Sequence, residues 1–310
     1  MGKSRQKIKC GVNMINTDIK GNIKIRKEFE QIVQNSNVLH SYLFLGEDGI
    51  GKKEIAKEFA KQILCLNKAE NCTCKSCICF DTENHPDFTI INEEGETIKI
   101  NTIREMISTV YEKPILSSKK IYIINDCDKM TKEAQNSLLK TLEEPPEYVT
   151  IILICSNEDN MLSTIKSRCT RIHFENLEIS EVKGYIKQNY PEIEIDDSII
   201  NLSQGSIGKA LKLNENKTLY ENIENILKSF KNKDVIDIVK MSEEIYKAKE
   251  EIYSVLEYMN VLLLKLSKED LRYINAIDIV EETKKRLKAN SNYDMCIDNL
   301  LFNINYLFRK

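Results

Sequence analysis

The spacing of the hydrophobic positions changes twice along the chain. Over the first 178 residues, four short apolar runs alternate with stretches of helical periodicity. These runs cover residues 42–45, 88–91, 121–124 and 149–155. Because such runs offer apolar side chains to both faces of a sheet, they predict parallel strands that helices cover on both sides. We therefore expect an α/β domain over residues 14–178, with its first helix at residues 23–38.

Beyond residue 178 the strand pattern disappears. Residues 179–213 predict two or three short helices around Gly205 and Gly208. Residues 214–310 have a helical pattern throughout and contain no glycine or proline, which predicts a helical bundle. One apolar stripe of this bundle comprises Val255, Leu256, Met259, Leu262 and Leu263. We expect residues 1–13 to form a flexible extension.

Charge and hydropathy narrow the class of protein. The 45 basic and 48 acidic side chains leave a net charge of -3, which argues against a chain that holds nucleic acid by itself through counterion release. No run approaches the roughly 20 apolar residues that cross a bilayer. The basic N-terminal stretch lacks the apolar core of a signal peptide. We therefore expect a cytoplasmic protein.

A glycine-rich loop, G-E-D-G-I-G-K-K, connects the first predicted strand to the next helix. It fits the phosphate-binding pattern G-x-x-x-x-G-K-[ST] except at its last place, where Lys53 replaces the hydroxyl that binds Mg²⁺. The candidate nucleotide-binding residues are Gly46, Gly49, Gly51 and Lys52. ATP or ADP could bind here without being cleaved. The alternative is an ordinary glycine-rich turn between a strand and a helix.

A second part of the magnesium site is also altered. A working ATPase of this class ends a buried strand in two acids, one to hold Mg²⁺ and one to orient the attacking water. Here the strand at 121–124 is followed by Asn125 and Asp126. Asparagine is neutral and a poor anchor for Mg²⁺. Together with Lys53, this change predicts that the chain does not hydrolyse ATP.

Four segments carry a more specific resemblance. They are N-S-L-L-K-T-L-E-E-P-P at 136–146, S-R-C at 167–169, H-S-Y-L-F at 40–44 and H-P-D at 85–87. Together they resemble the clamp-loader branch of the AAA+ ATPases, over about residues 14–212. The resemblance implies an AAA+ domain, a helical lid over 179–213 and an all-α collar domain over 214–310 that holds subunits together.

The departures indicate which kind of clamp-loader subunit the chain resembles. Gly208 stands where the motor subunits carry a sensor-2 arginine, in addition to the changes at Lys53 and Asn125. With these three losses in separate motifs, the chain resembles the delta-prime class, which is a non-hydrolysing stator of the DNA polymerase III clamp loader. The resemblance implies gamma/tau and delta subunits as partners. It also implies a part in loading the sliding clamp onto primed DNA, without intrinsic catalysis.

The same resemblance gives Arg168 a role. In S-R-C motifs the arginine acts in trans as an arginine finger, because a guanidinium stays charged and offers a fixed fork of donors to a transferring phosphoryl group. Taken alone, Arg168 would be a surface arginine in an ion pair. Asn157 lies at the sensor-1 place, where it could simply cap the next turn. Leu138, Leu139 and Leu142 are expected in the core.

Five of the ten cysteines fall between residues 65 and 79, which in a reducing compartment favours a metal site. Zn²⁺ takes four thiolates in a tetrahedron, and a C-x2-C turn supplies two of them. The family has one distant cysteine and then three at x2 spacing. The predicted structural zinc ligands are Cys65, Cys72, Cys74 and Cys77, with Cys79 as the substitute for Cys72. Reduced structural thiols or regulatory oxidation are the alternatives.

Two other functions fit parts of this pattern. The first is an active gamma/tau-type ATPase of the same fold, which would turn over Mg-ATP in isolation. The second is a zinc-dependent nucleic-acid-binding module on an inert phosphate-loop scaffold, which would bind DNA with a steep salt dependence.

Overall fold

The computed structural model describes residues 21–310 apart from 70–71, 93–95, 230–234, 269, 290 and 310. The extension expected at 1–13 lies outside the described residues. The chain divides into two compact units, residues 1–210 and 211–310.

The first unit is built on a parallel sheet of five strands in the order β2-β3-β4-β1-β5. The strands are β1 (Ser41–Leu45), β2 (Phe88–Ile91), β3 (Lys120–Ile124), β4 (Val149–Cys155) and β5 (Thr170–His173). Every residue of β1, β3 and β4 is buried, as expected of central strands. The predicted parallel sheet is confirmed, but the sequence did not indicate β5. Only Ile172 of this edge strand is buried, so it has no apolar run.

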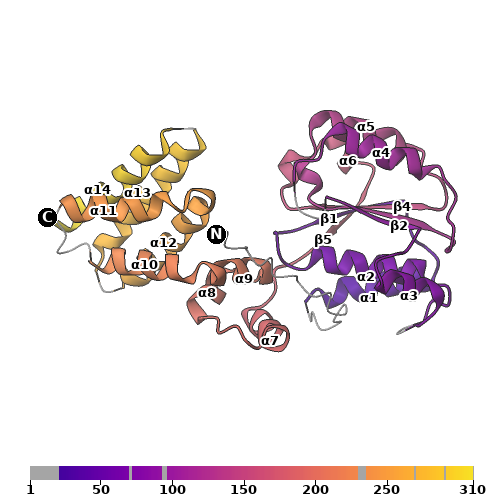
Figure 1. The fold of residues 1–310 in the computed structure, drawn as a ribbon, viewed down its shortest axis with the longest axis horizontal. Helices are drawn as coiled ribbons and strands as arrows, with labels where there is room; N and C mark the ends of the chain where they lie inside the picture. The colour runs from indigo at the N-terminus through magenta and orange to yellow at the C-terminus, as the bar shows by residue number, and fades with distance from the viewer. Residues whose placement is uncertain are drawn as a thin grey trace, which may run out of the picture. The chain divides into compact units, whose positions relative to one another are not determined.

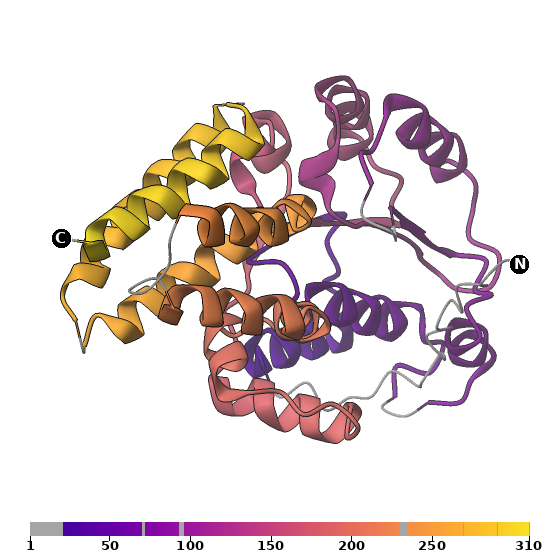
Figure 2. The ribbon, with the colours of Figure 1, turned by 60° about the vertical axis from the view of Figure 1, so that its left-hand side comes forward.

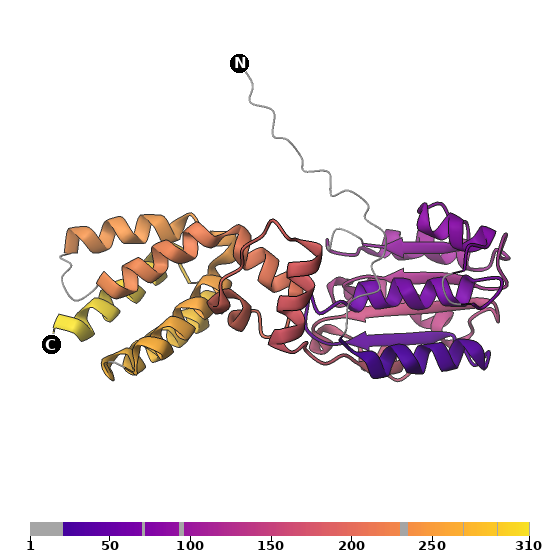
Figure 3. The same ribbon diagram turned by 90° about the horizontal axis from the view of Figure 1, so that it is seen from below.

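Helices cover both faces of this sheet. They are α1 (Ile23–Gln34), α2 (Lys52–Leu64), α3 (Lys75–Asp81), α4 (Ile100–Val110), α5 (Lys132–Glu143) and α6 (Ser163–Lys166). Helices α1 to α3 lie on one face and α4 to α6 on the other (Figures 1 and 2). Helix α1 ends at Gln34, four residues before the end that its pattern predicts. Its neighbour α2 runs beside it along the sheet (Figure 3).

Each face of the sheet has its own apolar core. On the α1 and α2 side, Phe29 stacks on Phe44 and Phe59, with ring centroids 5.3 and 4.1 Å away. On the other side, α5 contributes Leu138 and Leu142, as predicted, and Leu139 packs partly buried against the same core. Helix α5 ends at Glu143 because a proline two residues on cannot continue it.

Three short helices complete the first unit and lead into the second. They are α7 (Ile179–Asn189), α8 (Asp197–Leu202) and α9 (Ile207–Glu215), and α9 crosses the division between the units. The sequence had predicted two or three such helices.

The second unit consists of helices alone in its described residues. They are α10 (Lys217–Ser229), α11 (Val235–Tyr246), α12 (Ile252–Leu266), α13 (Arg272–Lys288) and α14 (Tyr293–Arg309), with one turn of 3-10 helix before α12. The apolar stripe predicted for α12 is buried. None of the helices in the described part of the chain has the length and apolar character needed to cross a bilayer.

Candidate functional site

The phosphate loop joins the end of β1 to the first residue of α2. Gly49 and Gly51 have φ angles of 75° and 90°, a backbone conformation that residues with a Cβ rarely adopt. The side chain of Lys52 turns back into the loop, where Nζ donates to the carbonyl oxygen of Gly46 at 2.7 Å and to Ser156 Oγ at 3.2 Å. Burial lowers the pKa of Lys52, and nearby acids partly oppose this shift. Oxygen atoms of the protein itself therefore hold the Lys52 ammonium group within the loop.

A pocket of about 340 Å³ lies beside this loop. It is lined by Asp48, Gly49, Gly51, Lys52, Lys53, Glu54, Asn125, Asp126, Lys129 and Ile154. The two departures from an ATPase motif, Lys53 and Asn125, thus line one pocket although they come from different elements. An ammonium group and a neutral amide occupy the places where a Mg²⁺ site needs a hydroxyl and an acid.

The residues after β3 are engaged in the protein's own hydrogen bonds. Asn125 is buried, and its Nδ2 donates to the carbonyl oxygen of Asn92 at 3.3 Å. Asn92 Nδ2 in turn donates to the carbonyl oxygen of Asn125 at 3.2 Å. The next residue, Asp126, forms an ion pair with Lys129, Oδ2 to Nζ, at 2.9 Å. The Asn125 side chain is therefore uncharged, and the negative charge of Asp126 is paired with the ammonium group of Lys129.

Gly208 lies directly against the phosphate loop. Its backbone N–H, on α9, donates to the carbonyl oxygen of Gly49 at 3.1 Å. A Cβ added to Gly208 would lie 2.9 Å from the Cα of Gly49, which is closer than real Cβ atoms approach. Ser206 Oγ also donates to the carbonyl oxygen of Asp48 at 2.8 Å. The backbone of Gly49 in the phosphate loop therefore fills the space that an arginine side chain at position 208 would need.

Asn157, at the sensor-1 place, caps the turn that follows it. Its Oδ1 accepts the backbone N–H of Asp159 at 3.1 Å, at the start of the short 3-10 helix Glu158–Asn160. The backbone N–H of Asn157 donates to Asp128 Oδ2 at 3.2 Å. The capping interpretation of this residue agrees with the geometry.

Arg168 follows α6 at the surface of the first unit. Its side chain keeps 33% of its accessible surface, so it does not point into the core, and it lies outside the lining of the phosphate-loop pocket. Its Nη2 forms an ion pair with Glu143 Oε1 at 2.5 Å, and its Nη1 donates to the carbonyl oxygen of Thr164 at 2.8 Å. Its own carbonyl oxygen accepts from Ser41 Oγ at 2.7 Å. The neighbouring Cys169 is buried, as its packing interpretation predicts.

The structure brings four cysteines together beside α3. The sulfur atoms of Cys65, Cys72, Cys74 and Cys77 lie within 4.8 Å of one another. Zn–S bonds of about 2.3 Å in a tetrahedron place sulfur atoms roughly 3.8 Å apart, so this group fits a zinc ion after small adjustments. Cys79, the predicted substitute, lies outside the group.

The local environment of these thiols suits metal ligands. Cys72 Sγ accepts hydrogen bonds from the backbone N–H of Cys74 and from Asn67 Nδ2, both at 3.4 Å. Burial raises the pKa of Cys77 above its usual range. For Cys74, burial also acts to raise the pKa, but hydrogen bonds from backbone N–H groups and from the neighbouring cysteine side chains together outweigh it and lower the pKa to about 6. The four thiols therefore ionise unequally unless a cation holds all four as thiolates.

His85 is a structural residue beside the cysteines and does not join their sulfur atoms. Its Nε2 lies 2.9 Å from Ser76 Oγ, and its Nδ1 accepts the backbone N–H of Asp87 at 3.1 Å. Burial lowers the pKa of His85, which agrees with a neutral ring that accepts this bond. The H-P-D motif thus fastens α3 to the start of β2.

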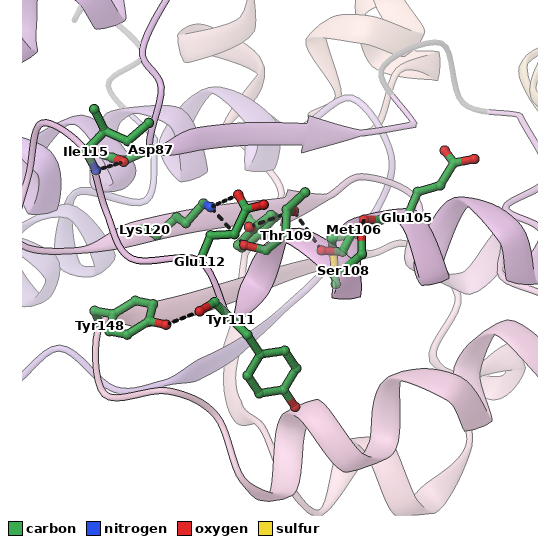
Figure 4. A network of polar contacts seen from close by, with 11 residues as sticks. Asp87, Glu105, Met106, Ser108, Thr109, Tyr111, Glu112, Ile115, Lys120 and Tyr148 are labelled. Carbon is green, nitrogen blue, oxygen red and sulfur yellow. Dashed lines mark hydrogen bonds and ion pairs between the residues drawn. The ribbon is translucent and has the colours of Figure 1, made fainter.

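Asp87 is an anchor that the sequence interpretation missed. Its carboxylate is fully buried and accepts the backbone N–H groups of Ile115, Leu116 and Ser117 at 2.6, 2.8 and 2.8 Å. Figure 4 shows the bond from Ile115 to Asp87 and a second contact, in which Lys120 Nζ donates to the carbonyl oxygen of Thr109 near the end of α4 (2.8 Å). Both contacts hold the segment between α4 and β3. The H-P-D motif was the available signal for Asp87.

Comparison with known proteins identifies the family. The family model described as "DNA polymerase III, delta subunit" matches residues 21–178, just over half of the chain. The chain belongs to this family. The expected relationship to the clamp-loader subunits is thereby confirmed.

Relatives of the family agree with this assignment. DNA polymerase III subunit delta' of Bacillus subtilis is 30% identical over 209 residues, which cover 67% of this chain and 63% of that protein. The delta' subunit of Pseudomonas aeruginosa is 34% identical over 137 residues, 43% of this chain and 42% of that protein. DNA polymerase III subunit tau/gamma of Haemophilus influenzae is 31% identical over 207 residues, 64% of this chain but 30% of that protein. Each match spans less than two thirds of the relative's own length.

A solved structure shows the same fold over nearly the whole chain. The gamma subunit-related protein of DNA polymerase III from Thermotoga maritima aligns with a TM-score of 0.51, covering 92% of this chain and 99% of that one. Because the two are 20% identical, the likeness concerns the fold alone.

Proposed function

We propose that the chain is a stator subunit of the delta-prime class in the DNA polymerase III clamp loader. It does not hydrolyse ATP itself, and it supplies Arg168 as an arginine finger to the ATP site of a neighbouring gamma/tau subunit. It assembles with gamma/tau and delta subunits through its collar, residues 214–310. The assembled loader places the sliding clamp on primed DNA. Membership of the family supports a place in the clamp loader, and the altered phosphate-loop pocket supports the non-hydrolysing role.

The observation that carries this proposal is the composition of the phosphate-loop pocket. Lys53 and Asn125 line it together, so the two groups that should hold Mg²⁺ are replaced within one site. The backbone contact between Gly208 and Gly49 occupies the third place, where a motor subunit needs a cationic side chain. Because phosphoryl transfer depends on Mg²⁺ and positive groups to neutralise developing charge, this site can hold a nucleotide but lacks the means to cleave it.

The position of Arg168 supports action on another subunit. It lies outside the lining of its own pocket, and its side chain is partly exposed. An arginine finger supplied in trans raises phosphoryl-transfer rates by about 10³-fold or more. The cysteine group beside α3 would hold a structural zinc ion, because four thiolates leave no open position for water or substrate.

The test uses the loader reconstituted from its own gamma/tau and delta subunits. With clamp and primed DNA present, Arg168→Ala in this chain alone should abolish the hydrolysis phase of the ATP site that faces it. Arg168→Lys should rescue little, because lysine keeps the charge but loses the planar fork. Arg171→Ala is the matched control, since Arg171 is a half-exposed arginine three residues on that pairs with Glu158.

Two results would overturn the proposal. The first is rapid phosphate release by the purified chain alone with Mg-ATP, abolished by Lys52→Ala, which would make it a motor subunit. The second is unchanged stimulated hydrolysis when Arg168 is replaced in an otherwise complete loader.

A further inference from the structure

The segment at 136–146 carries the longest resemblance in the sequence, yet its apolar residues explain only packing. Leu138 and Leu142 are buried in the core, and the prolines follow the end of α5. Glu143, the last residue of α5, is different. Its side chain keeps 47% of its accessible surface and forms the ion pair with Arg168. The charged end of this segment is therefore connected to the proposed finger.

Three of the four resembling segments meet at Arg168. Ser41, from the segment before the phosphate loop, donates to the carbonyl oxygen of Arg168 at 2.7 Å and holds its backbone. Thr164 and Glu143 hold the two terminal nitrogens of its side chain, at 2.8 and 2.5 Å. Backbone and guanidinium are thus fixed from different elements, β1, α6 and α5.

We propose that Glu143 is a positioning residue that orients the Arg168 guanidinium for the neighbouring ATP site. This inference rests on the function proposed above and names the residue through which the finger is held ready. A free arginine side chain samples many rotamers, and a finger must enter the partner's site in one of them. By pairing with one terminal nitrogen, Glu143 restricts these rotamers before the subunits meet, while other donors of the guanidinium stay available.

The place of Glu143 in its helix supports this role. The carboxyl end of a helix carries a partial negative charge, so an acid there is disfavoured unless a cation lies beside it. Arg168 supplies that cation. An acid at this position gains its stabilisation from the guanidinium that it orients, which ties the two side chains to each other.

The test compares Glu143→Gln with Glu144→Gln in the reconstituted loader, each in this chain alone. Glu144 is the exposed neighbour of Glu143 and receives the same chemical change. Glu143→Gln should lower the maximal rate of the hydrolysis phase that depends on Arg168 by about two- to fivefold, the factor that corresponds to an ion pair at a half-exposed site. KM for ATP should stay unchanged, because the finger acts in the transition state. Glu143→Asp should restore part of the rate, and Glu144→Gln should leave it unchanged.

A double substitution separates positioning from a general structural effect. In an Arg168→Ala background, Glu143→Gln should have no further effect, because a residue that acts only through Arg168 has nothing left to orient. Equal effects of Glu143→Gln in both backgrounds, or a faster rate in the single variant, would overturn the inference. If Arg168→Ala itself is silent, the proposed function fails. If only Glu143→Gln is silent, the arginine finger stands and the positioning role is wrong.

Discussion

Replacing Asp87 by asparagine tests how strongly the H-P-D motif holds the sheet. The carboxylate is fully buried and accepts three backbone N–H groups between α4 and β3. An asparagine side chain has one carbonyl oxygen, and its NH₂ group would face at least one of these donors. Each hydrogen bond to a charged group contributes about 1.5–3 kcal/mol, and a buried donor left without an acceptor costs about 1–3 kcal/mol.

Because part of this network survives the change, we expect Asp87→Asn to lower the free energy of unfolding of the first unit by about 3–5 kcal/mol. That is a large part of the roughly 5–15 kcal/mol that stabilises a domain. Asp81→Asn is the control. Asp81 pairs with Lys61 at 2.6 Å, but its side chain is 50% exposed, so its loss should cost about 1 kcal/mol or less.

The assay has to separate the two units. The chain contains no tryptophan, so urea unfolding is followed by circular dichroism, and amide hydrogen exchange locates the loss. Exchange should accelerate at Ile115, Leu116 and Ser117 and in β2 and β3, while the 211–310 unit keeps its protection. If Asp87→Asn and Asp81→Asn lower the stability equally, the carboxylate does not anchor this segment and the reasoning is wrong.

Three further predictions concern the remaining sites. Cys72→Ser should lower the zinc content of the purified protein and weaken its zinc affinity at least tenfold, whereas Cys79→Ser should change neither. The zinc affinity of both variants should weaken as the pH is lowered, because zinc binds thiolates and not thiols. Equal zinc loss in the two variants would contradict the ligand set. Asn125→Asp should make nucleotide binding measurably dependent on Mg²⁺ in titration calorimetry. If Mg²⁺ does not strengthen nucleotide binding by this variant, Asn125 is not the residue that prevents Mg²⁺ binding. Gly208→Ala should displace α9 from Gly49, destabilise this contact by about 1–3 kcal/mol and so speed hydrogen exchange of the α9 amides. Unaltered exchange would contradict the close contact.

Much of the α/β fold could be predicted because local pattern and tertiary role coincide. The central strands are buried on both faces, so they appear as continuous apolar runs, and the run at 149–155 matches β4 residue for residue. Strand β5 could not be found in this way. It lies at the edge of the sheet with one buried side chain, Ile172, and its pairing with β1 depends on a partner far away in the sequence.

The same division holds for the functional residues. Sequence alone determined the chemistry that is missing: Lys53 and Asn125 are departures from fixed motif positions, and no fold is needed to see that an ammonium and an amide bind Mg²⁺ poorly. It also narrowed the candidate metal ligands to five cysteines, and only the tertiary structure grouped Cys65, Cys72, Cys74 and Cys77 and left Cys79 out. Only the tertiary structure decided that Gly208 lies against Gly49 and that Glu143 pairs with Arg168. Such contacts join residues from separate elements, and a pattern of side chains along a chain records periodicity and local geometry but not the distances that packing of those elements creates.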